Sequence, residues 1–226
     1  MRSATRLSPA YHRADRLFRL NPNHSERVAW MAFVVLEGFS GTGKTSLATR
    51  LESQGWLRLQ ESAHAVPEDV PVAERADTAA DFSLLGATLM YSSVISKLRT
   101  TRNIVSEGYL LADLAYARIR YELKKSFAYP AMVSMVRRVL DEPAMKPDLY
   151  ILLRAGPHTI GLRQARKDDR EKNVSEYFRT RYYTALAEIH AELKEERTEV
   201  LETDSDLDAT LRSIMEILER RRVIMV

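Results

Sequence analysis

The sequence predicts a three-layer α/β sandwich, in which a parallel sheet of about five strands is covered by helices on both faces. Short apolar runs with the length of buried strands alternate along the chain with stretches whose apolar residues lie three and four positions apart. Parallel strands need long crossovers, which are usually helices, so this alternation predicts a parallel sheet. Ligands of such a sheet bind at the carboxyl ends of its strands.

The first strand and helix flank a phosphate-binding pattern. Gly38–Thr45 matches G-x-x-x-x-G-K-[ST] at every fixed position, between the apolar run Phe33–Leu36 and a helical stretch from Thr45 to Leu51. In this P-loop the glycines turn backbone N–H groups around a polyphosphate, the Lys44 side chain reaches the β and γ phosphates, and the Thr45 hydroxyl can ligate Mg²⁺. An unrelated Gly-rich turn would not need this strand and helix. The predicted nucleotide-binding residues are Gly38, Ser40, Gly41, Thr42, Gly43, Lys44, Thr45 and Ser46.

Composition favours one soluble domain. The chain has 226 residues, no cysteine and a formal net charge of +3. The absence of cysteine excludes disulfides and is typical of a reducing cytoplasm. No apolar run has membrane-spanning length, and the charge is too small to indicate nucleic acid as the main partner.

Residues 1–30 differ from the rest in composition. They hold six arginines against Asp15 and Glu26. We therefore divide the chain into a basic arm, residues 1–30, and a P-loop domain, residues 31–226. The arm is a peripheral extension, a partner-binding helix around Arg13–Leu20, or the product of an upstream start codon.

The remaining elements follow in order from hydrophobic periodicity. Further strands are expected at 56–59, 104–105, 149–153 and 198–202. Further helices are expected at 81–98, 113–124, 132–140, 162–170 and 207–218. The set Phe178, Tyr182 and Tyr183 has helical spacing and is predicted to belong to the core.

From Met31 onward the chain resembles the thymidylate kinases and their deoxynucleoside-kinase relatives within the P-loop kinases. The resemblance is carried by Phe33–Gly38 with the P-loop, by Glu107–Tyr116 and by Pro147–Leu153, in the same order and spacing. It implies a P-loop NTPase fold, ATP and Mg²⁺ as cofactors, and a lid at about residues 158–175.

Three departures bear on the acceptor. A thymidylate kinase usually carries Asp, Arg and Arg where this chain has Ser40, Met90 and Gly108. Without those arginines a dianionic monophosphate lacks fork-shaped partners. This pattern favours an acceptor with a neutral hydroxyl, whose proton a carboxylate must take.

Two acids are candidates for this chemistry. Glu61 follows the second strand, where the deoxynucleoside kinases carry their catalytic Glu, although a helix cap or an ion pair with a lid arginine is the structural alternative. Glu107 ends the third strand and is predicted to hold the Mg²⁺ hydration shell or to orient the acceptor. Glu37 is expected to hydrogen-bond the P-loop backbone. Tyr91 and Tyr109 are candidate acceptor-pocket residues.

A basic run follows the fourth strand. Arg163, Arg166 and Arg170 have helical spacing, which is also typical of a solvated helix face. Its position matches the lid of the resembled kinases, where arginines neutralise the transferring phosphoryl group. Arg163 and Arg166 are therefore predicted to be catalytic, together with Lys44 and Glu61.

The function predicted from sequence is transfer of the ATP γ-phosphate to a hydroxyl of a nucleoside-like small molecule, in the cytoplasm and without nucleic-acid or membrane partners. Nucleoside monophosphate kinase is the alternative, and a nucleotide-binding regulatory protein is a second one. A homodimer is a possible assembly.

Overall fold

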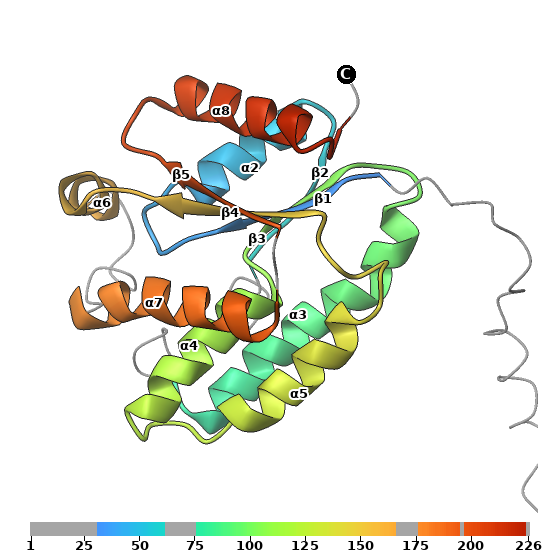
Figure 1. Ribbon diagram of the computed structural model, residues 1–226. Helices are drawn as coiled ribbons and strands as arrows, with labels where there is room; N and C mark the ends of the chain where they lie inside the picture. The colour runs from blue at the N-terminus through green and yellow to red at the C-terminus, as the bar shows by residue number, and fades with distance from the viewer. Residues whose placement is uncertain (1–30, 62–75, 166–175, 195–196, 225–226) are drawn as a thin grey trace, which may run out of the picture.

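The computed structural model describes residues 31–61, 76–165, 176–194 and 197–224. The five strands form one sheet in the order β2-β3-β1-β4-β5 (Figure 1). They are β1 (Phe33–Glu37), β2 (Leu57–Leu59), β3 (Ile104–Glu107), β4 (Leu149–Arg154) and β5 (Thr198–Glu202). Every pairing is parallel, so the predicted sheet and its five strands are confirmed.

Helices cover both faces of the sheet, as predicted. One face carries α2 (Lys44–Ser53) and α8 (Leu207–Arg220), and the other carries α3 (Thr78–Leu98), α4 (Leu110–Glu122), α5 (Tyr129–Leu140) and α7 (Glu176–Glu192) (Figure 1). The short α6 (Pro157–Gln164) lies beside the carboxyl end of β4. Among the described residues, no helix is both long and apolar enough to cross a membrane.

Burial on both faces explains why each central strand contains an apolar run. Every residue of β1 and β3 is buried, and in β4 only the last residue, Arg154, is exposed. The edge strands β2 and β5 are half-buried or exposed. Strands covered on both faces need continuous apolar runs, whereas edge strands tolerate charged side chains.

Helices α3, α5 and α6 begin earlier than periodicity predicts, because their first turns are set by polar and proline residues. Asp77 caps α3 by accepting a hydrogen bond from the Ala80 N–H at 3.0 Å, so this helix starts at Thr78 rather than at residue 81. Pro130 and Pro157 lie in the first turns of α5 and α6. The helix expected at 162–170 is seen as the end of α6, and its remainder lies outside the described residues.

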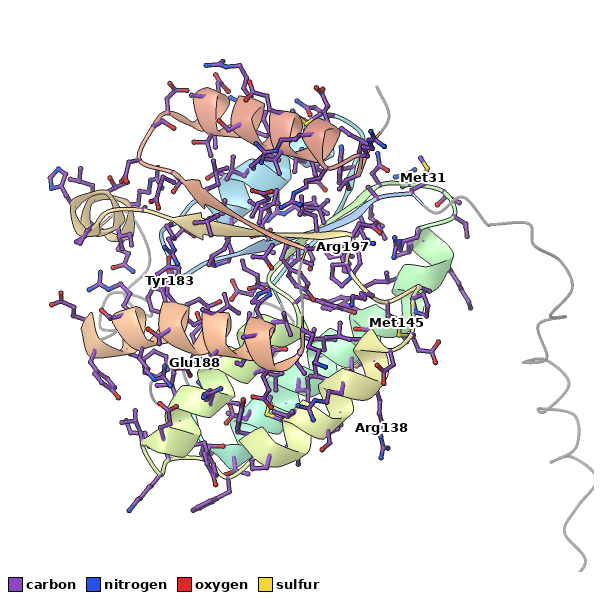
Figure 2. The ribbon with its side chains drawn as sticks, viewed as in Figure 1. Met31, Arg138, Met145, Tyr183, Glu188 and Arg197 are labelled. Carbon is purple, nitrogen blue, oxygen red and sulfur yellow. The ribbon has the colours of Figure 1, made fainter. Side chains whose placement is uncertain are left out.

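The aromatic set on α7 belongs to the core, as predicted. Phe178 and Tyr182 are almost fully buried, and the half-buried Tyr183 packs against the same cluster. Figure 2 shows Tyr183 at one end of the molecule and Met31, which precedes β1, at the other. The aromatic side chains of α7 therefore lie toward the carboxyl ends of the strands, where the P-loop begins.

Candidate active site

The loop between β1 and α2 has the backbone that its glycines predict. Gly38, Gly41 and Gly43 all have positive φ angles, of 151°, 91° and 98°. A Cβ atom on Gly38 would lie 2.7 Å from the Leu153 carbonyl oxygen, so the sheet leaves no space for a side chain there. Only glycine satisfies both requirements.

Side chains within the P-loop and outside it hold the loop through its carbonyl groups. Five successive carbonyl oxygens each accept a hydrogen bond from a side chain: Gly38 from Lys44 Nζ at 2.6 Å, Phe39 from Thr42 Oγ1 at 2.9 Å, Ser40 from Gln164 Nε2 at 3.3 Å, Gly41 from Arg163 Nη1 at 3.3 Å, and Thr42 from Thr203 Oγ1 at 2.9 Å. These bonds fix the peptide planes of the loop. The arrangement suits an anion-binding loop, because its carbonyl dipoles are already satisfied by protein groups.

Lys44 and Glu61 face each other at the mouth of this loop. Lys44 Nζ lies 3.7 Å from Glu61 Oε2, and the two side chains are 8% and 28% exposed. Glu61 follows β2, and its side chain passes Gly108, since a Cβ atom on Gly108 would lie 3.9 Å from Glu61 Cγ. The structure thus brings the predicted phosphate-binding lysine and the predicted base together. Among the described residues, Glu61 forms no ion pair with Arg163, whose guanidinium group donates to Thr203 instead.

Thr45 and Glu107 supply oxygen donors at one point. Thr45 Oγ1 donates to Glu107 Oε2 at 2.5 Å, and Glu107 Oε1 accepts from Arg58 Nε at 2.5 Å. A hydroxyl and a carboxylate this close fit the preference of Mg²⁺ for hard oxygen ligands, of which nucleotide phosphates and water would supply the others. Ser46, the next P-loop residue, is exposed at the start of α2.

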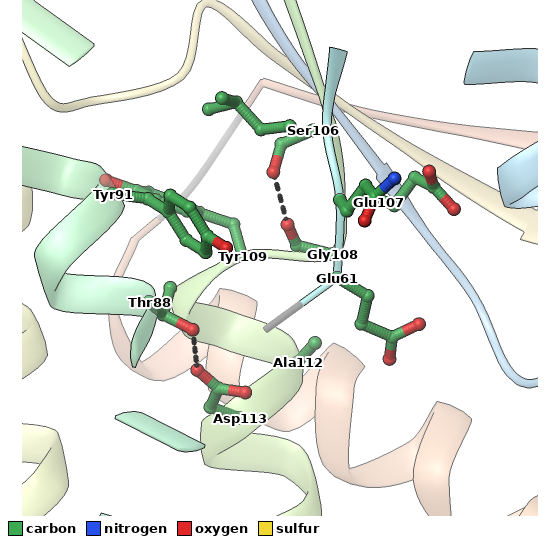
Figure 3. Close-up of a pocket in the computed structure, with 11 residues that line it drawn as sticks. Glu61, Thr88, Tyr91, Ser106, Glu107, Gly108, Tyr109, Ala112 and Asp113 are labelled. Atoms are coloured by element: carbon green, nitrogen blue, oxygen red, sulfur yellow. Dashed lines mark hydrogen bonds between the residues drawn. The ribbon is translucent and has the colours of Figure 1, made fainter. Parts of the chain in front are cut away.

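A narrow pocket opens beside Glu61, between the ends of β2 and β3 on one side and helices α3 and α4 on the other (Figure 3). Thr88 Oγ1 on α3 donates to Asp113 Oδ2 on α4 at 2.6 Å across it. The described residues that line the pocket include three acids and no lysine or arginine: Leu59, Gln60, Glu61, Thr88, Tyr91, Ser106, Glu107, Gly108, Tyr109, Ala112 and Asp113.

The two tyrosines predicted for the pocket differ in their surroundings. Tyr91 is half-buried on α3 and lines the pocket. Tyr109 also lines it, but its hydroxyl is within hydrogen-bond distance of Ser92 Oγ at 2.8 Å and donates to the Met145 carbonyl at 3.2 Å. Burial raises the pKa of Tyr109 to about 12. Its ring therefore lines the pocket, while its hydroxyl forms hydrogen bonds inside the protein.

Glu37, at the end of β1, does not bond the P-loop backbone as expected. Instead, its carboxylate accepts from the Tyr182 hydroxyl at 3.5 Å, and its Oε1 is buried without a hydrogen-bond partner. Burial raises the pKa of Glu37 well above its ordinary value, an effect opposed by Lys44 and increased by Asp113 and Glu61. A fully buried carboxyl with one unpaired oxygen is more stable protonated.

Glu37→Gln is expected to stabilise the fold in a pH-dependent way. The folded chain keeps a proton on Glu37 that the unfolded chain releases near pH 4.5, so wild-type stability falls as pH rises above that value toward the raised pKa. Glutamine cannot ionise, so the variant does not lose stability in this way as pH rises. In urea unfolding, the gain of the variant over wild type should be larger at about pH 8 than at about pH 5. A gain that does not change between the two pH values would contradict this account.

The lid arginines are described only in part. Arg163 Nη2 donates to the Thr203 carbonyl at 2.6 Å, and its Nη1 donates to Thr203 Oγ1 at 3.2 Å and to the Gly41 carbonyl. It therefore connects α6, the end of β5 and the P-loop. Arg166 and Arg170 lie outside the described residues, as do most of the predicted lid and the arm of residues 1–30.

Several site residues have no signal in the sequence. Arg58, Thr88, Asp113, Gln164 and Thr203 come from five different elements or loops, and none belongs to a motif of fixed spacing. Their partners are set by packing between elements. The position of Asp113 within the Glu107–Tyr116 segment was the one available clue.

Comparisons with known proteins support the fold. No protein-family profile matches the chain. Thymidylate kinase from Candida albicans superposes with a TM-score of 0.66 at 16% identity, over 86% of this chain and 93% of that one. Deoxyadenosine kinase from M. mycoides with bound dATP superposes with a TM-score of 0.64 at 18% identity, over 83% of this chain and 99% of that one. The chain thus has the P-loop kinase fold that these two kinases share, as its sequence predicts.

One curated protein matches a short part of the chain. Urease subunit gamma from Prochlorococcus marinus (strain MIT 9313) is 39% identical over 62 residues, or 27% of this chain. The chain spans 59% of that subunit's length. A match of this extent does not assign the chain to the urease subunits.

Proposed function

We propose that this protein is a magnesium-dependent kinase that transfers the ATP γ-phosphate to a hydroxyl of a nucleoside-like acceptor. One observation carries the proposal: Glu61 lies 3.7 Å from the P-loop lysine, at the edge of a pocket whose described lining has carboxylates and no cationic side chain. A phosphate-binding lysine and a base are thus adjacent where an acceptor hydroxyl would meet the γ-phosphate.

The chain's own groups divide the reaction as follows. The P-loop and Lys44 bind the β and γ phosphates, and Thr45 with Glu107 would hold Mg²⁺, which neutralises charge between those phosphates. Glu61 takes the proton of the acceptor hydroxyl while the oxygen of that hydroxyl bonds to the γ-phosphorus. The bond from that phosphorus to the β–γ bridging oxygen breaks, and ADP leaves with its electron pair. The roles of Arg163 and Arg166 in neutralising the phosphoryl oxygens remain predictions.

The acidic pocket supports a neutral acceptor. A monophosphate dianion would face Glu61, Glu107 and Asp113, and repulsion between like charges disfavours its binding. Gly108 has φ of 73°, a conformation that strains an arginine, and Met90 is 75% exposed and is not one of the lining residues.

Two alternatives remain. The likeness to thymidylate kinase favours a nucleoside monophosphate kinase, and a P-loop alone is compatible with a nucleotide-binding regulatory protein. ADP release should be measured with nucleosides, nucleoside monophosphates and modified sugars side by side. Turnover that needs an added small molecule supports a kinase, and the preferred compound identifies its class. Sedimentation of the same sample measures the oligomeric state and so tests whether the chain forms a homodimer.

A shortened chain that starts at Met31 is expected to fold and to bind ATP. The described kinase elements all lie downstream of Met31, whose N–H donates to the Arg99 carbonyl at 2.8 Å, a contact that the truncation keeps. Thermal unfolding with and without MgATP measures both properties, since a bound ligand raises the unfolding temperature. Loss of the ATP-dependent rise in the shortened chain would show that the arm is part of the site.

A further inference from the structure

Arg58 lies on the edge strand β2 and reaches toward the P-loop helix. Its neighbours Leu57 and Leu59 pack against the core on one face of the sheet, and alternation along the strand directs Arg58 to the other face. There its Nη1 donates to Thr49 Oγ1 on α2 at 2.9 Å and lies 3.8 Å from Glu52 Oε2. The guanidinium group is therefore fixed on the side of α2.

The third partner of Arg58 is the predicted metal-binding acid. Arg58 Nε donates to Glu107 Oε1, so the other oxygen of this carboxylate, Oε2, is the one that meets Thr45. The Glu107 side chain is 1% exposed and that of Arg58 is 16% exposed. A charge-assisted hydrogen bond in so enclosed a place fixes both the rotation and the position of the carboxylate.

We propose that Arg58 is a positioning residue for the metal–nucleotide site: it holds Glu107 with one oxygen directed at the point where Thr45 would ligate Mg²⁺. This inference rests on the proposed magnesium-dependent function. Groups that orient metal-binding residues typically change metal affinity by about 10–100-fold when they are replaced. If Arg58 only connected β2 to α2, its replacement would change the stability of the fold and leave the Mg²⁺ requirement unchanged.

The test uses the full chain and compares Arg58→Met, Arg58→Lys and Arg50→Met with wild type. Methionine keeps much of the aliphatic length but removes the hydrogen bonds, and lysine keeps the charge without the planar donor group. Arg50 is the matched control, because it lies on the neighbouring α2 and its ion pair with Asp208 is solvent-exposed. At fixed ATP, thermal unfolding gives the Mg²⁺ concentration for half of the maximal stabilisation, and calorimetry gives ATP affinity with and without Mg²⁺.

Arg58→Met is expected to raise the half-saturating Mg²⁺ concentration by about 10–100-fold, with metal-free ATP affinity unchanged. Arg58→Lys should show a smaller rise, and Arg50→Met none. A folded Arg58→Met protein with the wild-type Mg²⁺ requirement would overturn the proposal. If Arg58→Met fails to fold, Arg58→Lys decides in the same way. If wild type itself shows no Mg²⁺-dependent nucleotide binding, the proposed function fails instead.

Discussion

Lys44→Ala is expected to abolish measurable phosphoryl transfer while the protein stays folded. Lys44 Nζ is the cation at the mouth of the P-loop, and its present partners are the Gly38 carbonyl and Glu61. Removing one preorganised donor that stabilises developing charge costs typically ~10²–10³-fold in turnover, and here a full positive charge is lost as well. Acceptor-dependent ADP release measures turnover, and circular dichroism with thermal unfolding verifies the fold.

Lys97→Ala is the matched control for this experiment. Lys97 is an exposed lysine in the last turn of α3 and does not line the acceptor pocket. Its loss should leave turnover within about twofold of wild type, as surface substitutions away from special features have small effects. Near-normal turnover of a folded Lys44→Ala protein would exclude the kinase mechanism proposed above.

The sheet could be predicted because its inner strands are buried on both faces. Runs such as Phe33–Leu36 and Leu149–Leu153 contain few polar residues, and few other structures accommodate them in a chain of this charge. Strand order and helix starts were less visible. The first turn of α3 depends on Asp77, and the first turn of α5 contains Pro130, so the apolar period alone places their starts too late.

The candidate site could be predicted where chemistry and chain position coincide. Gly38–Thr45 is contiguous, and Glu61 and Glu107 each follow a strand, so parallel topology alone brings them to one edge of the sheet. The hydrogen bond of Arg58 with Glu107 and that of Thr88 with Asp113 join residues 49 and 25 positions apart. Sequence spacing carries no information about such pairs, because strand register decides the first and the rotation of each helix about its axis decides the second.

One expectation about a single residue was wrong, and a second residue has a partner that the sequence did not indicate. Glu37 was expected to hydrogen-bond the P-loop backbone, but its carboxylate is fully buried and accepts from the Tyr182 hydroxyl instead. Tyr109 lines the pocket, and its hydroxyl bonds Ser92 and the Met145 carbonyl. In both cases a buried polar group took the partner that the surrounding helices offered.

The chemical step is tested most directly at Glu61. Its carboxylate is the described acid nearest to Lys44 Nζ, and at 28% exposure it remains accessible to an acceptor. Glu107, the other acid on that side, has both oxygens engaged by Thr45 and Arg58, which makes it a poor proton acceptor for the substrate. These contacts favour Glu61 as the base.

Glu61→Gln is therefore expected to lower kcat by about 10²–10⁴-fold while ATP affinity changes little, because general-base catalysis contributes that factor in the transition state. Glu216→Gln, an exposed position on α8, is the matched control and should keep wild-type kcat. Steady-state kinetics at saturating ATP, with calorimetric ATP binding, separates the two effects. An acceptor profile that favours thymidylate or another monophosphate over every neutral alcohol would contradict the neutral-acceptor mechanism. The alternative would then need another phosphate-binding cation, and Arg75 and the lid arginines would be the side chains to replace next.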